Sequence, residues 1–538
     1  SGEDATKVNI SVSAGTVGNI YAAGVGGEAG VDGGNDVNGT PAADFGSLTG
    51  KADITIDNDA VITGNIYASG QGYTQKDYGK GNAYLDGEAN ITVNGGTIKG
   101  NIYGGGEGVN KAGFEKSARV CKNSKVTVEI KGGLIEGYVY GGGKVAEVEG
   151  STNVIISGGT IKGNVYGGGE AGLTHGRAAV HMANGTVNGS IYGGALGKVG
   201  DRFVYGGSTV NMTGGWVRGN VYGGSELSND GKSGEQDEKS ASGLVFVNLA
   251  GGTVSGKVFG GGFQGIVNGS THVHIGLGAI DKCNYYKSHA EEKPVLDASG
   301  LSVGGSVYAG GDYGGDSADL NYDTITVNGF SHVYIDGTDY SFGAGDTGGK
   351  KMEIAGGVFG SGASCDAGDV RLVTLDHFGA AASGGGQPEQ VTGTVTSIQR
   401  ADQVRLIQTH VRLAGQSDVA NSNQTTPYSL NRIGDKGNFD KLGELGNSLV
   451  LEGGSTLVLD SASNSVANLK SVDDTESKVV TQADLAHCPN TVVLSTGTVF
   501  RISNTSQGDS EEYGAVTGYF YMIAGDTADA YAFARAKT

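Results

Sequence analysis

The stretch ITVNGGTIKGNIYGGG, residues 91–106, decides the expected fold, because close copies of it recur along the chain. Residues 154–169 read VIISGGTIKGNVYGGG, and residues 210–224 read VNMTGGWVRGNVYGG. Self-similarity at a short period predicts a repeat architecture in place of one compact core. Further copies begin at Val128, Val180 and Val247, and looser copies end at Tyr21, Tyr67, Tyr308 and Phe359.

Each copy alternates apolar and polar residues, turns at a glycine pair, alternates again and turns at a second glycine cluster. A period of two predicts β-strands, and glycine is expected where the chain bends sharply or takes a positive φ. Strands this short bury an apolar face only when they stack, so the chain is expected to be all-β, a solenoid of parallel sheets. The residues of the quoted copy expected in the core are Ile91, Val93, Ile98 and Ile102, and those expected outside or at a turn are Thr92, Lys99 and Asn101.

The spacing of the repeated aromatic residue predicts the length of one coil. Tyr140, Tyr166 and Tyr192 follow one another at 26 residues (166 − 140 and 192 − 166), and three short strands with three bends fit that length. Longer spacings mark insertions, which fall mainly after the aromatic residue, as in residues 24–50, 70–87, 106–123 and 225–242. We therefore expect long loops on one edge of the solenoid, and loops on a rigid scaffold are a usual place for binding.

The repeat weakens after Asp366, and residues 380–390 have the composition of a joint. We expect a glycine-rich parallel β-helix over residues 1–379. Residues 380–538 form an irregular β region that either continues the solenoid or caps it as a C-terminal domain. The phrase LVLEGGSTLVL, residues 449–459, favours continuation.

Composition narrows the class of protein. The chain has 102 glycines but 5 prolines, which excludes collagen, and a net charge of −20, which argues against nucleic acid or an anionic membrane as a partner. Its four cysteines show no CxxC spacing, so we expect packed or incidental thiols and no disulfide framework. No apolar run is long enough to cross a bilayer. We expect a fragment of a larger secreted polypeptide that is monomeric on its own.

The GGTIKGNVYGGG units resemble those of large adhesin-like surface proteins of gut bacteria, and LVLEGGSTLVL resembles the β-helical passengers of autotransporter adhesins. The resemblance covers about the first 360 residues through the repeat and the remainder loosely. It implies a right-handed parallel β-helix that is extracellular, displayed on a bacterial cell surface and adhesive. The implied partner is a host glycoprotein, a glycan or a protein on another cell surface. Because the shared motifs are structural, they assign no functional residue.

An enzyme is the alternative, because parallel β-helices also resemble pectate lyases and polygalacturonases. Such a polysaccharide lyase or glycoside hydrolase needs carboxylates on neighbouring coils for acid and base work or for calcium. The outward position after the turn instead reads Lys99, Glu136, Lys162, Asn188 and Arg218. We therefore predict no catalytic residues and no enzymatic activity. A passive structural spacer is the third possibility.

Aromatic residues in the insertions are the candidate binding residues, because tyrosine offers a flat face together with a hydroxyl that stays in water. The alternative role is to pin each insertion onto the solenoid. Trp216 replaces a threonine of the repeat and is either exposed or fills a gap. The candidates are Tyr73, Tyr78, Tyr84, Trp216, Tyr285 and Tyr286.

Two groups of residues suggest metal binding. An acidic glycine-rich stretch could wrap calcium through Asp312, Asp316, Asp319 and Asp323, the alternative being a solvated acidic loop. His272 and His274 share one face of an expected strand, which suits zinc if a third ligand is present. No third ligand is evident, so we interpret them as surface histidines. We predict no firm metal site, and no cofactor other than calcium is suggested.

Overall fold

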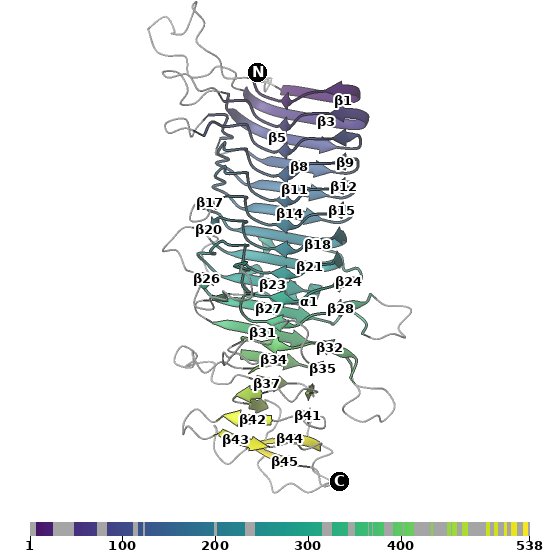
Figure 1. The fold of residues 1–538 in the computed structure, drawn as a ribbon, viewed down its shortest axis with the longest axis vertical. Helices are drawn as coiled ribbons and strands as arrows, with labels where there is room; N and C mark the ends of the chain where they lie inside the picture. Colours follow the sequence, from purple (N-terminus) through teal and green to yellow (C-terminus); the bar gives the residue numbers. More distant parts are fainter. Residues whose placement is uncertain are drawn as a thin grey trace, which may run out of the picture.

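The structure is a computed structural model of the 538-residue chain. It describes residues 7–24, 48–72, 83–110, 117–121, 124–197, 202–231, 243–314, 325–342, 350–363, 365–367, 370–380, 391–401 and 403–413, and beyond them the short strands between residues 432 and 535 with Ser455. The fold is all-β and consists of long parallel sheets of many strands. Figure 1 shows the strands lying one above another from the N-terminal to the C-terminal end of an elongated stack.

A 20-stranded sheet runs along most of the stack. Its pairings are all parallel, and each repeat contributes one longer strand and, in many repeats, a second short one. The longer strands are β1 (Lys7–Val17), β3 (Leu48–Ile62), β5 (Leu85–Val93), β8 (Val126–Ile130), β11 (Thr152–Ile156), β14 (Ala178–Met182), β18 (Ser208–Val217), β21 (Val245–Val254), β23 (Thr271–Ile275), β27 (Ser331–Asp336), β31 (Arg371–Asp376), β34 (Gln403–Ile407), β37 (Leu449–Glu452) and β40 (Leu469–Ser471). The short ones are β6 (Thr97–Ile98), β9 (Leu134–Ile135), β12 (Thr160–Ile161), β15 (Thr186–Val187), β24 (Leu301–Val303) and β28 (Met352–Ile354).

An 11-stranded parallel sheet carries the repeated aromatic residue. Its strands are β2 (Ile20–Tyr21), β4 (Ile66–Tyr67), β7 (Ile102–Tyr103), β10 (Val139–Tyr140), β13 (Val165–Tyr166), β16 (Ile191–Tyr192), β19 (Val221–Tyr222), β22 (Val258–Phe259), β25 (Val307–Tyr308), β29 (Val358–Phe359) and β33 (Ile398–Gln399). Two small sheets pair β17 (Arg202–Val204) with β20 (Asn229–Asp230), and β26 (Ile325–Val327) with β30 (Asp366–Ala367).

Register follows the predicted repeat. Thr152 pairs with Val126 on one side and with Ala178 on the other, each 26 residues away (152 − 126 and 178 − 152). The predicted core residues Ile91, Val93, Ile98 and Ile102 are all fully buried, which confirms the alternation inferred from the sequence. The core is therefore a slim column of branched aliphatic side chains between the sheets.

Two ladders of side chains run along the stack, and both are structural. The aromatic rings from Tyr21 to Phe359 stack with their centroids 4.5–5.0 Å apart. The amide of Asn101 accepts a hydrogen bond from the backbone N–H of Tyr138 at 2.9 Å and donates to the hydroxyl of Tyr103 at 2.9 Å. Each such asparagine thus provides a hydrogen-bond acceptor for a backbone N–H in the turn of the next repeat, while stacking buries the faces of the aromatic rings.

Glycine is required at the bends for two different reasons. Gly96 has φ +80°, a conformation that side chains other than glycine rarely adopt. Gly100 has no such φ, but a Cβ there would lie 2.1 Å from the carbonyl oxygen of Gly64 in the preceding repeat. The second glycine cluster has the same cause as Gly100, because a Cβ on Gly104 would lie 2.2 Å from the carbonyl oxygen of Gly141 in the next repeat.

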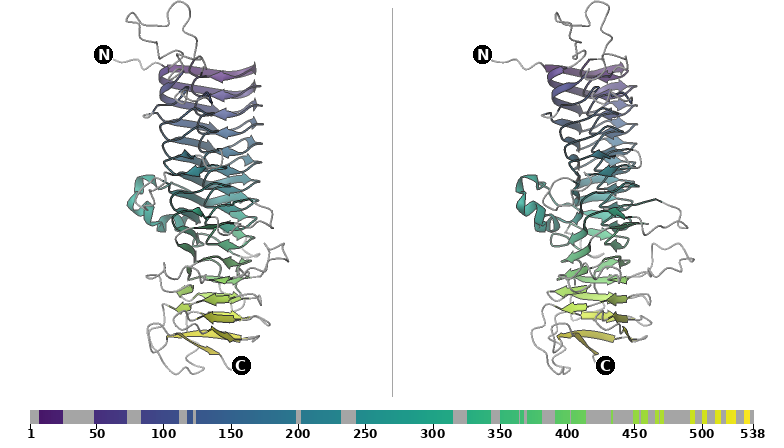
Figure 2. Two further views of the ribbon diagram at one scale, coloured as in Figure 1. Left: turned by 60° about the vertical axis from the view of Figure 1, so that its left-hand side comes forward. Right: turned by 90° about the vertical axis from the view of Figure 1, so that its left-hand side faces the viewer.

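The insertions do not all follow the aromatic residue. Most of residues 24–50, 70–87 and 225–242 and part of residues 106–123 lie outside the described part of the chain. Two other insertions instead separate the strands of the 20-stranded sheet, between β23 and β24 and between β27 and β28. The first contains α1 (Leu277–Lys282), α2 (Asn284–Ser288) and η1 (Ala290–Glu292), and Figure 2 shows it as the teal helical segment that stands off one side of the stack. Among the described residues, no helix has the length and apolar character of a membrane span.

Parallel pairing continues past residue 380, because β31 pairs with β34 and β34 with β37. The last strands pair antiparallel, β41 with β44, β44 with β45 and β42 with β43. One sheet of this region contains β32 (Gly393–Val395), β35 (His410–Leu413), β38 (Thr456–Leu459), β41 (Thr491–Leu494), β44 (Gly518–Ala524) and β45 (Tyr531–Arg535). The other contains β36 (Arg432–Ile433), β39 (Ser465–Ala467), β42 (Phe500–Ser503) and β43 (Ser510–Tyr513).

Candidate functional site

A cavity of about 700 Å³ lies on the outer face of the 20-stranded sheet, beside the helical segment formed by α1, α2 and η1. Because Val273 and Ile275 point into the core, the alternate residues His272 and His274 of β23 point outward. The neighbouring strands β27, β31 and β34 supply the rest of the floor. Its side chains include His272, His274, His332, Tyr334, Thr374 and Arg405, and the helical segment adds Lys282, Cys283, Tyr285 and Lys287.

Aromatic packing holds the helical segment against the sheet. Phe246 of β21 points outward and meets Tyr285 and Tyr286 of α2, with ring centroids 5.2 and 5.0 Å apart. Ile280 of α1 belongs to the same buried cluster. Burial of these rings removes a large apolar area from water, so the segment is fixed to the sheet.

Ion pairs between a partly exposed lysine and two buried carboxylates fix the end of α1. The ammonium of Lys282 lies 2.6 Å from a carboxylate oxygen of Asp336 and 2.6 Å from one of Asp376. Burial alone would lower the pKa of Lys282, but its hydrogen bonds to these two carboxylates outweigh burial and raise it. For Asp376, burial is outweighed by the hydrogen bonds from Lys282, Tyr334 and His377, and the pKa is lowered. Lys282 therefore remains charged and ties α1 to β27 and β31.

Three histidines of the cavity floor are neutral at ordinary pH. Burial, with a smaller effect of His332, lowers the pKa of His272 to about 3. Burial and the two neighbouring imidazoles hold the pKa of His274 well below its usual value. Burial and Arg405 lower the pKa of His332 to about 4. Each neutral ring keeps one nitrogen lone pair, which can accept a proton or bind a metal ion.

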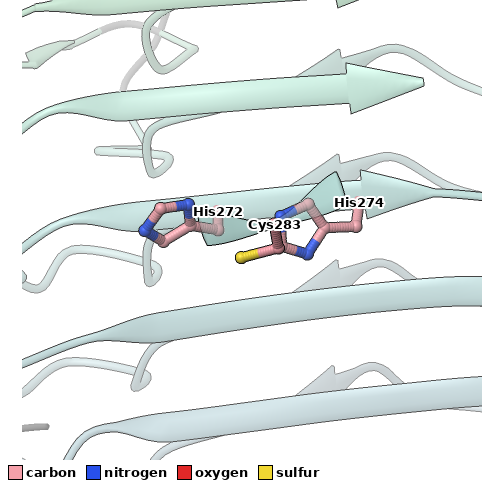
Figure 3. A group of neighbouring side chains, drawn as sticks. All are labelled: His272, His274 and Cys283. Atoms are coloured by element: carbon pink, nitrogen blue, oxygen red, sulfur yellow. The ribbon is translucent and has the colours of Figure 1, made fainter. Parts of the chain in front are cut away.

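The helical segment brings a thiol to two of these rings. The donor atoms of His272, His274 and Cys283 all lie within 4.8 Å of one another, and all three residues are buried. Figure 3 shows Cys283 between the two imidazoles. Within the described residues this is the one cluster of three such side chains that could hold a metal ion.

This geometry corrects the interpretation of His272 and His274 as surface histidines. They are 8% and 2% exposed, and Cys283 is the third donor that the sequence did not reveal. The sequence did not indicate that Cys283 lies beside the histidines, because Cys283 belongs to an insertion whose sequence does not match the repeat. The available signal was the length of that insertion and its sequence CNYYK, residues 283–287, directly after a strand with outward histidines.

Comparisons with known proteins add no further evidence. No protein-family model matches the chain. No curated protein and no solved structure matches it either.

The predicted aromatic binding residues differ in how far their side chains are exposed to solvent. Tyr285 and Tyr286 are 7% and 3% exposed, so they do not offer open faces and instead pin the insertion, the second of the two roles considered. Trp216 is 43% exposed, and its indole N–H donates to the hydroxyl of Ser255 at 2.8 Å. Tyr84 is partly buried, with the guanidinium of Arg119 6.0 Å from its ring centre. Tyr73 and Tyr78 lie outside the described residues.

Of the predicted calcium ligands, only Asp312 is described; Asp316, Asp319 and Asp323 lie outside the described residues. Asp312 pairs through its backbone with Phe263 and Ala363 of the neighbouring repeats. Burial raises its pKa, although the backbone N–H of Gly314 and the charge of Lys257 act in the opposite direction. The position of this carboxyl group is therefore set by the pairing of neighbouring repeats.

The cysteines that the structure describes, Cys121, Cys283 and Cys365, form no disulfide with one another. Cys365 is buried and contacts the hydroxyl of Thr326 at 3.2 Å. Cys488 lies outside the described residues. The expectation of packed thiols is confirmed for Cys283 and Cys365.

Proposed function

We propose that the chain is a right-handed parallel β-helix that serves as the rigid stalk of an adhesin-like protein, secreted by or displayed on a bacterial cell. The observation that carries this proposal is the in-register parallel pairing of successive repeats, from β1 and β3 to β34 and β37. Connections between parallel strands of one sheet are right-handed in about 98% of cases, which favours that hand.

Rigidity is supported by the contacts between repeats. Each repeat is joined to the next by backbone hydrogen bonds, by the asparagine amides and by the stacked aromatic rings. In a solenoid each unit contacts only its neighbours, so such repeated contacts set the stiffness of the whole. A stiff stack of this kind is suited to extending a binding surface away from a cell.

The proposed partner is a host glycoprotein, a glycan or a surface protein of another cell. A net charge of −20 disfavours nucleic acid and anionic lipid, since both would be repelled. Exposed aromatic side chains are suited to sugar and protein contacts. Trp216 remains such a residue, and Tyr73 and Tyr78 remain predictions from the sequence.

Glycan and glycoprotein arrays probed with the whole chain test this function. We expect selective binding that weakens about ten-fold or more when Tyr73 and Tyr78 are both replaced by alanine, which is the usual size of a hot-spot loss. Tyr138→Ala is the matched control, because Tyr138 is also exposed, at 43%. Unchanged binding by the double variant would remove this loop from the site. No binding to any array element would contradict adhesion and favour the passive spacer.

A polysaccharide-degrading enzyme is the second candidate, and the cavity on the outer sheet face favours it. The cavity holds neutral imidazoles beside the cationic side chains of Lys287 and Arg405, which suit an acidic sugar. Incubation with acidic polysaccharides, followed by chromatography of the products, tests this activity. Release of oligosaccharides by the parent chain but not by His332→Ala would support the enzyme, and intact polymer would contradict it.

A further inference from the structure

A chain of hydrogen bonds fixes the orientation of His274. The amide nitrogen of Asn211 donates a hydrogen bond to the Nδ1 of His181 at 3.1 Å. The amide oxygen of Asn211 accepts a hydrogen bond from the amide nitrogen of Asn248 at 2.7 Å. The same amide nitrogen of Asn248 donates to the hydroxyl of Tyr286 at 3.0 Å. The amide oxygen of Asn248 therefore faces the Nδ1 of His274, 2.8 Å away, and accepts a hydrogen bond from it.

This arrangement leaves the Nε2 lone pair of His274 free to bind a cation. A ring nitrogen that donates to a carbonyl or amide oxygen fixes the tautomer of the imidazole and makes the other nitrogen the ligand. Asn248 thus has the position that an outer partner of a metal-bound histidine normally occupies. The amide is fully buried, so this contact is shielded from water.

His272 lacks a hydrogen-bond partner among the described residues. Its ring stacks on Phe246 with centroids 4.9 Å apart and meets the edge of Phe330 at 4.9 Å. The residue is 8% exposed and lines the cavity, and neither of its ring nitrogens is fully buried without a partner, so they keep contact with solvent there. A neutral imidazole with no protein partner can offer a nitrogen lone pair to an ion in the cavity.

Cys283 is delivered by a segment that is already anchored. Lys282 directly before it is bound to Asp336 and Asp376, and Tyr285 and Tyr286 after it pack on Phe246. The thiol is therefore held near the imidazoles without any need for an ion to order the chain. Preorganisation of this kind is what a binding site requires.

We propose that His272, His274 and Cys283 form a site for a transition-metal ion that favours imidazole and thiolate, represented by Zn²⁺. Donor atoms around one tetrahedral zinc lie roughly 3.3–3.6 Å apart, given Zn–N near 2.0 Å and Zn–S near 2.3 Å. The donor atoms lie within 4.8 Å of one another, so binding of one zinc ion requires them to approach by about 1 Å. Three protein ligands leave the fourth position open to the cavity, where water or a group of a bound molecule can occupy it.

Cobalt(II) titration of the reduced, metal-free whole chain tests the site directly. We expect one equivalent to bind, with visible bands of tetrahedral cobalt and a near-ultraviolet thiolate-to-cobalt band, and Zn²⁺ should displace it. The measurement uses the parent chain, so it does not depend on a variant that folds. No bound cobalt, or binding without the thiolate band, would overturn the proposal.

Variants assign the ligands. Cys283→Ser should abolish the thiolate band, and Asn248→Ala should weaken zinc binding about 10–100-fold, because it removes the partner that orients His274. The matched controls are Cys121→Ser and His175→Ala, which remove a free thiol and a partly exposed imidazole elsewhere on the stack. Circular dichroism of each variant verifies the fold. Equal zinc affinity in Cys283→Ser and in the parent chain would overturn the assignment, and this result is independent of whether the chain is an adhesin.

Discussion

Replacement of Asp230 by asparagine should stabilise the chain at neutral pH and leave it unchanged in acid. Asp230 on β20 is 1% exposed, and its carboxyl group accepts hydrogen bonds from Ser225, from the hydroxyl at 2.6 Å and from the backbone N–H at 2.8 Å. Burial raises its pKa from 3.8 to about 7, although both bonds from Ser225 act in the opposite direction.

The direction of the pH effect follows from the pH at which the unfolded and the folded chain each lose the proton of Asp230. Above about pH 4 the unfolded chain loses this proton, whereas the folded chain retains it up to about pH 7. The free energy of unfolding of the parent chain is therefore unaffected by Asp230 below the pKa of the unfolded state. It falls as pH rises from there towards the pKa of the folded state. The pKa of Asp230 differs by about 3 between the unfolded and the folded chain. At 1.36 kcal/mol for each pKa unit, the free energy of unfolding lost above pH 7 is on the order of 4 kcal/mol. Asparagine has nearly the same shape and does not ionise, so the variant should avoid this loss.

Urea unfolding at several pH values between 4 and 8 measures the difference, with the fluorescence of Trp216 as the probe. Trp216 is the single tryptophan of the chain and lies in the same repeat as Asp230. The advantage of Asp230→Asn should grow with pH, and Asp59→Asn, which changes an exposed carboxylate, should show no such growth. A difference between parent and variant that does not vary between pH 4 and pH 8 would refute the reasoning.

Three further outcomes are expected in urea unfolding. Tyr140→Ala should lower the free energy of unfolding by about 3–5 kcal/mol, because it leaves a gap in the aromatic ladder; a loss below about 1 kcal/mol would mean that the rings repack. Asn101→Ala should cost about 1–3 kcal/mol, because the next repeat loses a hydrogen bond; an unchanged midpoint would contradict a structural role. Lys282→Ala should cost about 3 kcal/mol, since Asp336 and Asp376 would be left buried without a cation, and a double change of both aspartates to asparagine should restore much of it.

The repeat could be read from the sequence because its signals are local. The alternation around Ile91 and Val93, followed by glycine at the bend, predicts which side chains are buried, and this prediction needs no information about distant residues. The same holds for Asn101 and Tyr103, since their interaction spans two residues and recurs in register. The reason for some glycines was not local: Gly100 depends on the backbone of the preceding repeat.

The binding residues were harder to predict, because an aromatic residue in an insertion can face water or the stack. For Tyr285 and Tyr286 the sequence left both roles open, and packing against Phe246 decided between them. His272 and His274 were placed on the correct face of a strand, but the covering of that face by the helical segment was not predictable from their spacing.

By itself, the sequence determined an all-β chain of stacked parallel strands, the members of its core and the length of one repeat, because the two-residue pleat and the 26-residue spacing recur along the chain. Only the tertiary structure decided where Cys283 and Lys282 lie. Lys282 meets carboxylates 54 and 94 residues away, and such contacts depend on how one insertion packs across three repeats, which no local period encodes.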